Sequence, residues 1–191
     1  MSRAIIYTSI YHSPCGDIRL GEFDGRLCLC DWVNGMKAEA TRKILARILK
    51  AEFHPKDSGE NKATMTKSPI TGRTTTTSPV LDLAAKELEE YFSGIRTSFD
   101  IPLLFVGTEF QKKVWNELAK IPYGTTISYG ELACRIGHPS AVRAVANANA
   151  RNPISILAPC HRVIGSDRRL TGYGGGLPAK KFLLELENEQ I

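Results

Sequence analysis

Two adjacent residues, Cys160 and His161, carry side chains suited to nucleophilic chemistry. They follow the apolar run Ile154–Ala158, which predicts a short strand that ends just before the cysteine. An imidazole that is itself held by a carboxylate can take the proton of a nearby thiol and leave a reactive thiolate. Neighbours on extended backbone point to opposite sides, so we expect the two side chains to communicate through a water molecule. The alternative interpretation is an inert buried cysteine beside a surface histidine.

A glycine-rich stretch and an acidic residue follow the cysteine. Residues 172–176 read Gly-Tyr-Gly-Gly-Gly, which predicts a loop that a ligand can approach closely, with Tyr173 as one wall of a flat pocket. Pro178 is expected to open a final helix, and Glu187 lies near its end, where a carboxylate is unfavourable against the helix dipole. A buried role would explain Glu187 at this position; a solvated surface acid is the alternative.

Two short helices are predicted before the cysteine. Ser128 and Glu131 form a capping box that opens a helix over 129–136. A tight turn then leads into a second helix over 140–150, capped by its first residue, a serine, and rich in alanine. This helix-turn-helix pattern favours DNA binding, because small side chains let a helix approach a groove closely. Tight packing inside the protein is the alternative, and Arg143 would then be an exposed charge.

The first half of the chain predicts strands over 4–11, 18–22 and 27–32, with an Asp-Gly hairpin turn between the last two. An apolar stripe over 40–53 predicts a helix. Residues 55–79 are rich in Ser, Thr and Lys and predict a flexible segment, after which Ser78 and Pro79 open a helix that ends near Gly94.

The predicted fold class is therefore mixed α/β, of the α+β kind. We expect a small N-terminal domain of sheet and helix over 1–104, which includes the flexible segment. A mainly helical C-terminal domain over 105–191 would carry the helix-turn-helix and a short active-site strand.

Composition limits the possible partners. The 191 residues are 42% hydrophobic and 24% charged, which is typical of a globular chain. No apolar run approaches the ~20 residues of a membrane span, and the first residues lack a signal-peptide block. We therefore expect no membrane partner and a cytoplasmic location, or a nuclear one in a eukaryote. The net charge of +5 permits a polyanionic partner without requiring one, and five irregularly spaced cysteines favour a reducing compartment.

The motif Pro159-Cys160-His161-Arg162-Val163 resembles the active-site signature of the O6-alkylguanine-DNA alkyltransferases, also called methylated-DNA–protein-cysteine methyltransferases. Other motifs occur in the order and spacing of that family: Tyr123-Gly124, Ile127-Ser128-Tyr129, Arg143-Ala144-Val145, Asn152-Pro153, Gly175-Gly176-Leu177 and Leu183-Leu184 through Glu187. The close resemblance covers roughly residues 105–188, and residues 4–104 resemble the family's N-terminal domain more loosely.

The resemblance implies stoichiometric DNA repair. Cys160 would accept a methyl or other alkyl group from O6-alkylguanine in double-stranded DNA, after the base is flipped out of the duplex. His161 would take the thiol proton through a water, and Glu187 would orient His161. Asn152 would brace the turn before the active-site strand, and Tyr129 would donate a proton toward the purine ring as guanine leaves.

The remaining implied roles concern the base. Arg143 would fill the space of the flipped nucleotide, and Val163, Tyr173 and Gly174 would line the base pocket together with the Cys160 backbone. Gly174 stands where some relatives carry Ser. In addition, Asn149 stands where others carry a larger apolar residue.

The implied reaction needs no cofactor and no metal, because the acceptor is the protein itself. The product is a thioether that thiol exchange does not reverse, so each chain, expected to be a monomer, would act once. The residues argue against two other functions, because Cys160 is present and a helix-turn-helix does not call for hydrolase chemistry. Alkyltransferase-like proteins bind alkylated DNA but lack the cysteine, and a Cys-His hydrolase would need an oxyanion site and turnover.

Overall fold

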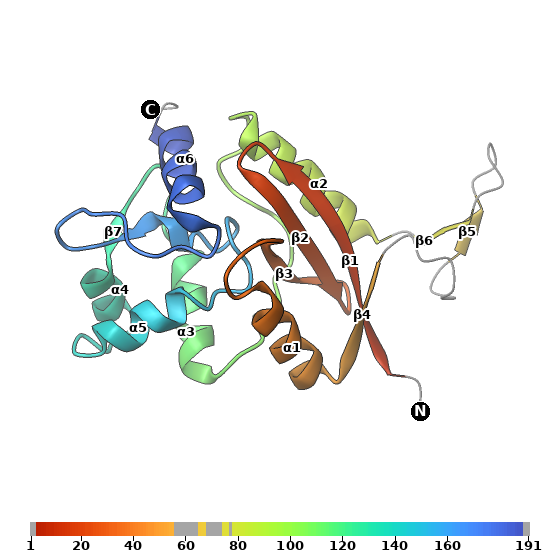
Figure 1. The fold of residues 1–191 in the computed structure, drawn as a ribbon, viewed down its shortest axis with the longest axis horizontal. Coiled ribbons are helices and arrows are strands. Elements are labelled where there is room, and N and C mark those ends of the chain that lie inside the picture. The colour runs from red at the N-terminus through yellow and green to blue at the C-terminus, as the bar shows by residue number, and fades with distance from the viewer. Residues whose placement is uncertain (1–2, 56–64, 68–73, 77, 189–191) are drawn as a thin grey trace.

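The computed structural model of the protein describes residues 3–55, 65–67, 74–76 and 78–188 (Figure 1). In chain order its elements are β1 (Ala4–Ser13), β2 (Gly16–Phe23), β3 (Arg26–Trp32), α1 (Ala38–Leu49), β4 (Ala51–Pro55), β5 (Met65–Lys67), β6 (Thr74–Thr76), α2 (Pro79–Phe92), α3 (Glu109–Leu118), β7 (Ile127–Ser128), α4 (Tyr129–Arg135), α5 (Val142–Asn149), the 3-10 helix η1 (Cys160–Arg162), β8 (Val163–Ile164) and α6 (Gly176–Asn188). The predicted class, a sheet followed by a mainly helical part, is confirmed.

The N-terminal sheet has the order β3-β2-β1-β4, with β4 parallel to β1 and the other pairs antiparallel. Asp24 and Gly25 form the predicted hairpin turn, since both adopt the positive φ that such a turn requires, at 51° and 71°. Helix α2 packs with one face of the sheet in the main core, while Leu45 of α1 belongs to a smaller core on the other face (Figure 1).

The helix predicted over 40–53 is too long. Helix α1 ends at Leu49, Lys50 adopts a left-handed φ of 52°, and residues 51–55 instead form β4 beside β1. Its predicted inner stripe is also partly exposed, because Ile48 is 48% accessible. Hydrogen bonding to a strand more than forty residues away overrides the local helical period here.

The predicted flexible segment at 55–79 lies largely outside the described residues. Within it, β5 and β6 pair as antiparallel strands. Helix α2 then starts as expected: the Ser78 hydroxyl accepts a hydrogen bond from the Leu81 amide at 3.3 Å, and Pro79 occupies the first helical position.

The two helices before the cysteine, α4 and α5, form as predicted and pack together. Ser128 and Glu131 make the expected capping box. The prediction that Ser140 caps the second helix is wrong: α5 starts at Val142 with no side-chain cap.

Two pairings connect distant parts of the chain with the segment around Cys160. Strand β7 pairs in parallel with β8, which brings the start of α4 beside Val163. The edge strand β3 bridges to the segment before the cysteine, where the Ser155 amide donates to the Cys30 carbonyl at 2.6 Å. Among the described helices, none is both long and apolar enough to cross a membrane.

Candidate active site

The run before Cys160 is a turn rather than the predicted strand. Only Ile154 makes a bridge, to Cys30, and residues 155–157 turn, with Ile156 at a positive φ of 71°. Cys160 then begins the 3-10 helix η1. The run is apolar because every residue in it is buried, and burial alone does not require extended backbone. A short strand, β8, does form directly after η1.

Asn152 holds this turn through three hydrogen bonds. Its amide nitrogen donates to the carbonyls of Ile154 at 3.1 Å and Ala158 at 2.7 Å, and its side-chain oxygen accepts from the Ile154 amide at 3.0 Å. The side chain is 7% exposed and joins the two ends of the turn. The bracing contacts expected of Asn152 are therefore present, around a turn whose shape the sequence did not predict.

Cys160 is buried, with 5% of its surface exposed. Burial raises the pKa of its thiol to about 11, although the Asn152 side chain and the positive charge of Lys180 act in the opposite direction. The resting side chain is thus a neutral thiol at physiological pH, and a nucleophile forms only if a base takes its proton.

His161 can be that base. Its Nε2 lies 2.8 Å from Oε1 of Glu187, while its Nδ1 is buried and has no hydrogen-bond partner among the described residues. Since the carboxylate accepts, Nε2 carries the proton and Nδ1 keeps a free lone pair. Burial lowers the pKa of His161 despite the opposing effect of Glu187. The ring is therefore neutral at rest.

Glu187 is 1% exposed and is shared by several donors. Arg162 donates to both of its oxygens at 2.9 Å, Tyr91 donates at 2.8 Å and the Gly124 amide at 3.2 Å. Burial would raise the pKa of Glu187, but the hydrogen bonds from His161 and Arg162 outweigh it and lower the pKa to about 2. The acid is a buried carboxylate, as its unfavourable place near the end of α6 suggested.

Sequence reasoning assigned no role to Arg162, Tyr91 or Lys180. Arg162 lies inside the quoted motif, so its position was a usable signal; Tyr91, 96 residues before Glu187, offered none. Lys180 is fully buried on α6, and its Nζ donates to the carbonyls of Val163 at 2.7 Å and Thr171 at 3.0 Å. Burial lowers the pKa of Lys180 to about 8. This cation ties α6 to the strand after the cysteine.

Tyr129 lies beside the segment that follows Cys160, because it directly follows β7, which pairs with β8. Val163 is buried and Tyr129 is half-buried. The Thr171 hydroxyl donates to the Tyr129 hydroxyl at 3.2 Å, which leaves the phenolic proton of Tyr129 available for donation.

The glycine-rich loop packs against the end of β3. The rings of Trp32 and Tyr173 are 6.0 Å apart, and Tyr173 lies 6.4 Å from His161. A Cβ atom on Gly175 would lie 2.5 Å from the Trp32 indole, so only glycine allows this contact. A Cβ on Gly174 would instead lie 3.7 Å from Oδ1 of Asp31.

Buried polar atoms without partners gather around Cys160. Among the described residues there are four: Trp32 Nε1, Asn149 Oδ1, His161 Nδ1 and the Tyr173 hydroxyl. Unsatisfied buried groups are rare in native proteins and mark places where a ligand supplies the missing partner. Trp32 and Tyr173 interact with each other, whereas His161 Nδ1 and Asn149 Oδ1 are left near Cys160 to meet a polar molecule.

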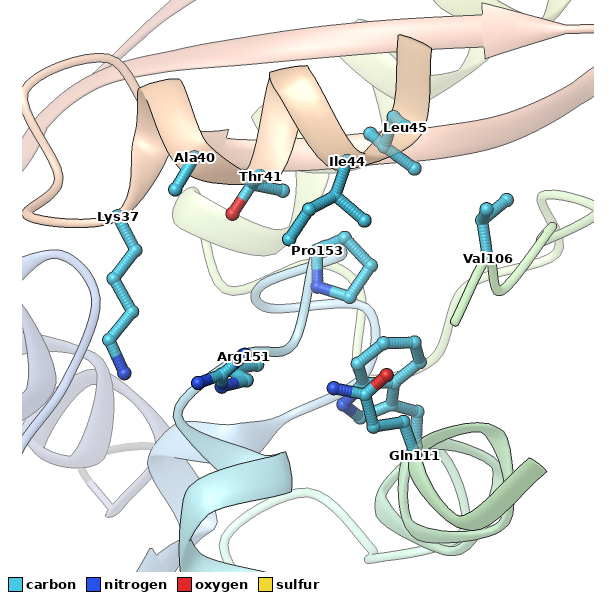
Figure 2. A pocket seen from close by; sticks show the side chains of 10 residues that line it. Lys37, Ala40, Thr41, Ile44, Leu45, Val106, Gln111, Arg151 and Pro153 are labelled. Carbon is cyan, nitrogen blue, oxygen red and sulfur yellow. The ribbon is translucent and has the colours of Figure 1, made fainter. Parts of the chain in front are cut away.

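Arg143, the remaining predicted residue, is exposed on α5. A separate cavity of about 230 Å³ lies between α1 and α3 (Figure 2). Figure 2 shows Lys37 and Thr41 on one side of it and Arg151 and Pro153 on the other. Cys160 does not line it. Across the described part of the chain, no three His, Cys, Asp or Glu side chains gather as a metal site.

Comparisons with known proteins give one consistent result. Residues 6–105 match the family model "6-O-methylguanine DNA methyltransferase, ribonuclease-like domain", and residues 109–189 match "6-O-methylguanine DNA methyltransferase, DNA binding domain". A methylated-DNA--protein-cysteine methyltransferase of Methanosarcina acetivorans is 60% identical over 104 residues, which are 54% of this chain and 67% of that protein.

Solved structures agree with the sequence matches. The O6-methylguanine methyltransferase of Mycobacterium tuberculosis is 36% identical, with a TM-score of 0.74 over 97% of this chain and 94% of that one. The Mycobacterium tuberculosis protein in complex with DNA has the same identity, coverage and TM-score.

Proposed function

The chain belongs to the 6-O-methylguanine DNA methyltransferase family, and we propose that it repairs O6-alkylguanine in DNA by moving the alkyl group onto its own Cys160. One observation carries the assignment of the acceptor. A buried thiol adjoins a buried imidazole whose Nε2 is held by Glu187 and whose Nδ1 is unpartnered. This arrangement prepares a base and a nucleophile in a site closed to bulk water.

In the proposed reaction, Sγ of Cys160 attacks the alkyl carbon in line with the bond to O6 of guanine. The thiol proton passes to Nδ1 of His161, through a water, as the S–C bond forms and the C–O bond breaks. Tyr129 donates its phenolic proton to the departing guanine, which is otherwise a poor leaving group. Its contact with Thr171 leaves that proton free and supports this role.

The target oxygen is hidden inside a duplex, so the base must leave the stack at a cost of a few kcal/mol. We assign Arg143 to the vacated space, because it is exposed on the helix that follows the turn of the helix-turn-helix pair. Val163, Tyr173 and Gly174 would line the pocket for the flipped base. The buried ring of Tyr173, 6.4 Å from that of His161, supports its place in this pocket.

The thioether product ends the reaction, so we propose one transfer per chain. No cofactor takes part. We propose that the protein acts as a monomer. We also propose the domain division at residues 104 and 105, and a cytoplasmic or nuclear location, where the DNA substrate is found.

A labelled duplex tests the assignment. An oligonucleotide with one radiolabelled O6-methylguanine is incubated with wild type, Cys160→Ala and Cys134→Ala, and protein-bound label is counted after denaturation. Cys134 is exposed on α4 and serves as the matched control. We expect one label per chain in wild type and Cys134→Ala, and none in Cys160→Ala, which still binds the duplex.

Three results would contradict this proposal. Label on Cys160→Ala would place the acceptor elsewhere, binding without label by the wild type would indicate a non-catalytic binder, and repeated turnover by the wild type would indicate a hydrolase.

A further inference from the structure

Cys160 opens into a second, very small cavity, distinct from the one between α1 and α3. Its volume is about 10 Å³, roughly one water molecule, and its walls come from both halves of the chain. It is lined by Asp31, Gly35, Lys37, Thr41, Asn149, Ala150, Asn152, Ser155, Cys160 and Gly174. An alkyl group larger than methyl would extend into this space beyond the carbon that Sγ attacks.

Part of the wall of this cavity is polar. Asp31 is 8% exposed and Asn149 is 3% exposed, yet both line the cavity. Asn149 Oδ1 has no hydrogen-bond partner among the described residues. Asp31 Oδ1 accepts from the Trp32 amide at 2.9 Å, which fixes the carboxylate at the end of β3. A methyl group gains nothing from either acceptor.

The placement of Asp31 follows from the docking of β3. Cys30 bridges to Ile154, so the next residue of the strand necessarily lies beside the turn that precedes Cys160. Burial raises the pKa of Asp31 to about 6, which leaves it largely a carboxylate at neutral pH. The N-terminal sheet thus contributes a fixed hydrogen-bond acceptor to a site whose chemistry belongs to the C-terminal part.

We propose that Asp31 and Asn149 form a polar wall that favours O6-alkyl groups ending in a hydroxyl, such as 2-hydroxyethyl, over apolar groups of the same size. This inference rests on the proposed function, because it concerns what Cys160 receives. The hydroxyl donates to one of the two acceptors and takes no part in bond making or breaking. Because the cavity is so small, the last atom of a two-carbon chain touches the wall, and its polarity decides the fit.

The expected preference for a hydroxyl-ended alkyl group is large enough to measure. A site that offers hydrogen bonds discriminates strongly against an analogue that leaves its buried groups unpaired, because the desolvated acceptors lose their partner. We expect at least a ~10-fold preference from one such bond. Lys37 also lines the cavity, but its Nζ lies 3.4 Å from the Ala150 carbonyl, so that amine already has an acceptor.

The test uses three duplexes that differ only in the O6 group: methyl, 2-hydroxyethyl and n-propyl, the last two being nearly equal in size. Single-turnover rates of transfer to Cys160 are measured for wild type, Asn149→Leu, Asp31→Leu and Asn116→Leu. Asn116 is exposed on α3 and bonds only its own helix, so it controls for the Asn-to-Leu change. The deciding quantity is the hydroxyethyl-to-propyl rate ratio, in which general damage to a variant cancels.

We expect Asn149→Leu to lower this ratio at least ~10-fold from the wild-type value, Asp31→Leu to lower it as well, and Asn116→Leu to leave it unchanged. If one of the two site variants fails to fold, the rate ratio of the other still tests the proposal. A ratio that neither site variant changes overturns the polar wall. Absence of methyl transfer to wild-type Cys160 would instead overturn the proposed function itself.

Discussion

Glu187 and His161 form a buried pair in which Oε1 of the acid accepts from Nε2 of the imidazole at 2.8 Å. The acid is held in turn by Arg162, through two hydrogen bonds of 2.9 Å. The ring therefore has one protonated nitrogen and one free nitrogen, in a fixed orientation. The chemistry proposed for Cys160 depends on this relationship.

Replacing Glu187 with glutamine should slow alkyl transfer by ~10²-fold or more, the usual scale for a positioned general base. It should also lower stability by ~1–3 kcal/mol, because Arg162 loses a charged partner in the interior. Single-turnover kinetics and thermal melting measure the two effects. Glu185→Gln is the control, since Glu185 is exposed on the same helix. Wild-type rate in Glu187→Gln would remove the acid from the mechanism.

Asn152→Ala should reduce stability and rate together. The alanine leaves the Ile154 amide without its acceptor, at a cost of ~1–3 kcal/mol, and removes one of the two hydrogen bonds that each of the Ile154 and Ala158 carbonyls accepts. The turn that positions Cys160 would then loosen. Melting temperature and transfer rate should both fall, whereas Asn116→Ala, on the exposed face of α3, should change neither. A melting temperature equal to wild type would rule out the bracing role.

Arg143→Ala should slow repair in duplex DNA more than in single strands. The proposed role of this side chain is to hold the base in its flipped position. In a single strand the base has no paired, stacked position to return to, so this role is not needed. Arg135→Ala, on α4, removes the same charge and should slow both substrates equally through weaker phosphate attraction. Transfer rates on matched oligonucleotides measure this. Equal slowing by Arg143→Ala would count against its insertion into the stack.

Lys180 should make stability depend on pH in the alkaline range. Burial lowers its pKa from 10.5 to about 8, so between these values the unfolded chain binds the proton that the folded chain has lost. Stability should therefore rise with pH across this window, by about 3 kcal/mol from this group.

The comparison that isolates the effect is urea unfolding of wild type and Lys180→Met from pH 7.5 to 10.5. As pH rises, the unfolding free energy of the wild type should increase relative to that of Lys180→Met. Lys181→Met, at an exposed position beside it, should run parallel to wild type. A constant difference between wild type and Lys180→Met would show that the buried amine keeps its ordinary pKa.

Much of the molecule could be predicted from local patterns. The Asp24-Gly25 turn, the Ser128 capping box and the start of α2 at Pro79 all depend on residues a few positions apart, and all form as expected. The resemblance at residues 159–163 likewise indicated the acceptor and its histidine. Short-range hydrogen bonds and backbone preferences act within one segment, so sequence alone specifies them.

Tertiary structure decided what depends on contacts between distant segments. The run before Cys160 is a turn because Asn152 binds both of its ends, and the end of the helix predicted over 40–53 became β4 because β1 offered an edge. Tyr91, which donates a hydrogen bond to Glu187, lies on the distant helix α2. Asp31 lies beside the turn before Cys160 because β3 docks beside Ile154. No local period carries such information, since burial and pairing across the chain set these positions.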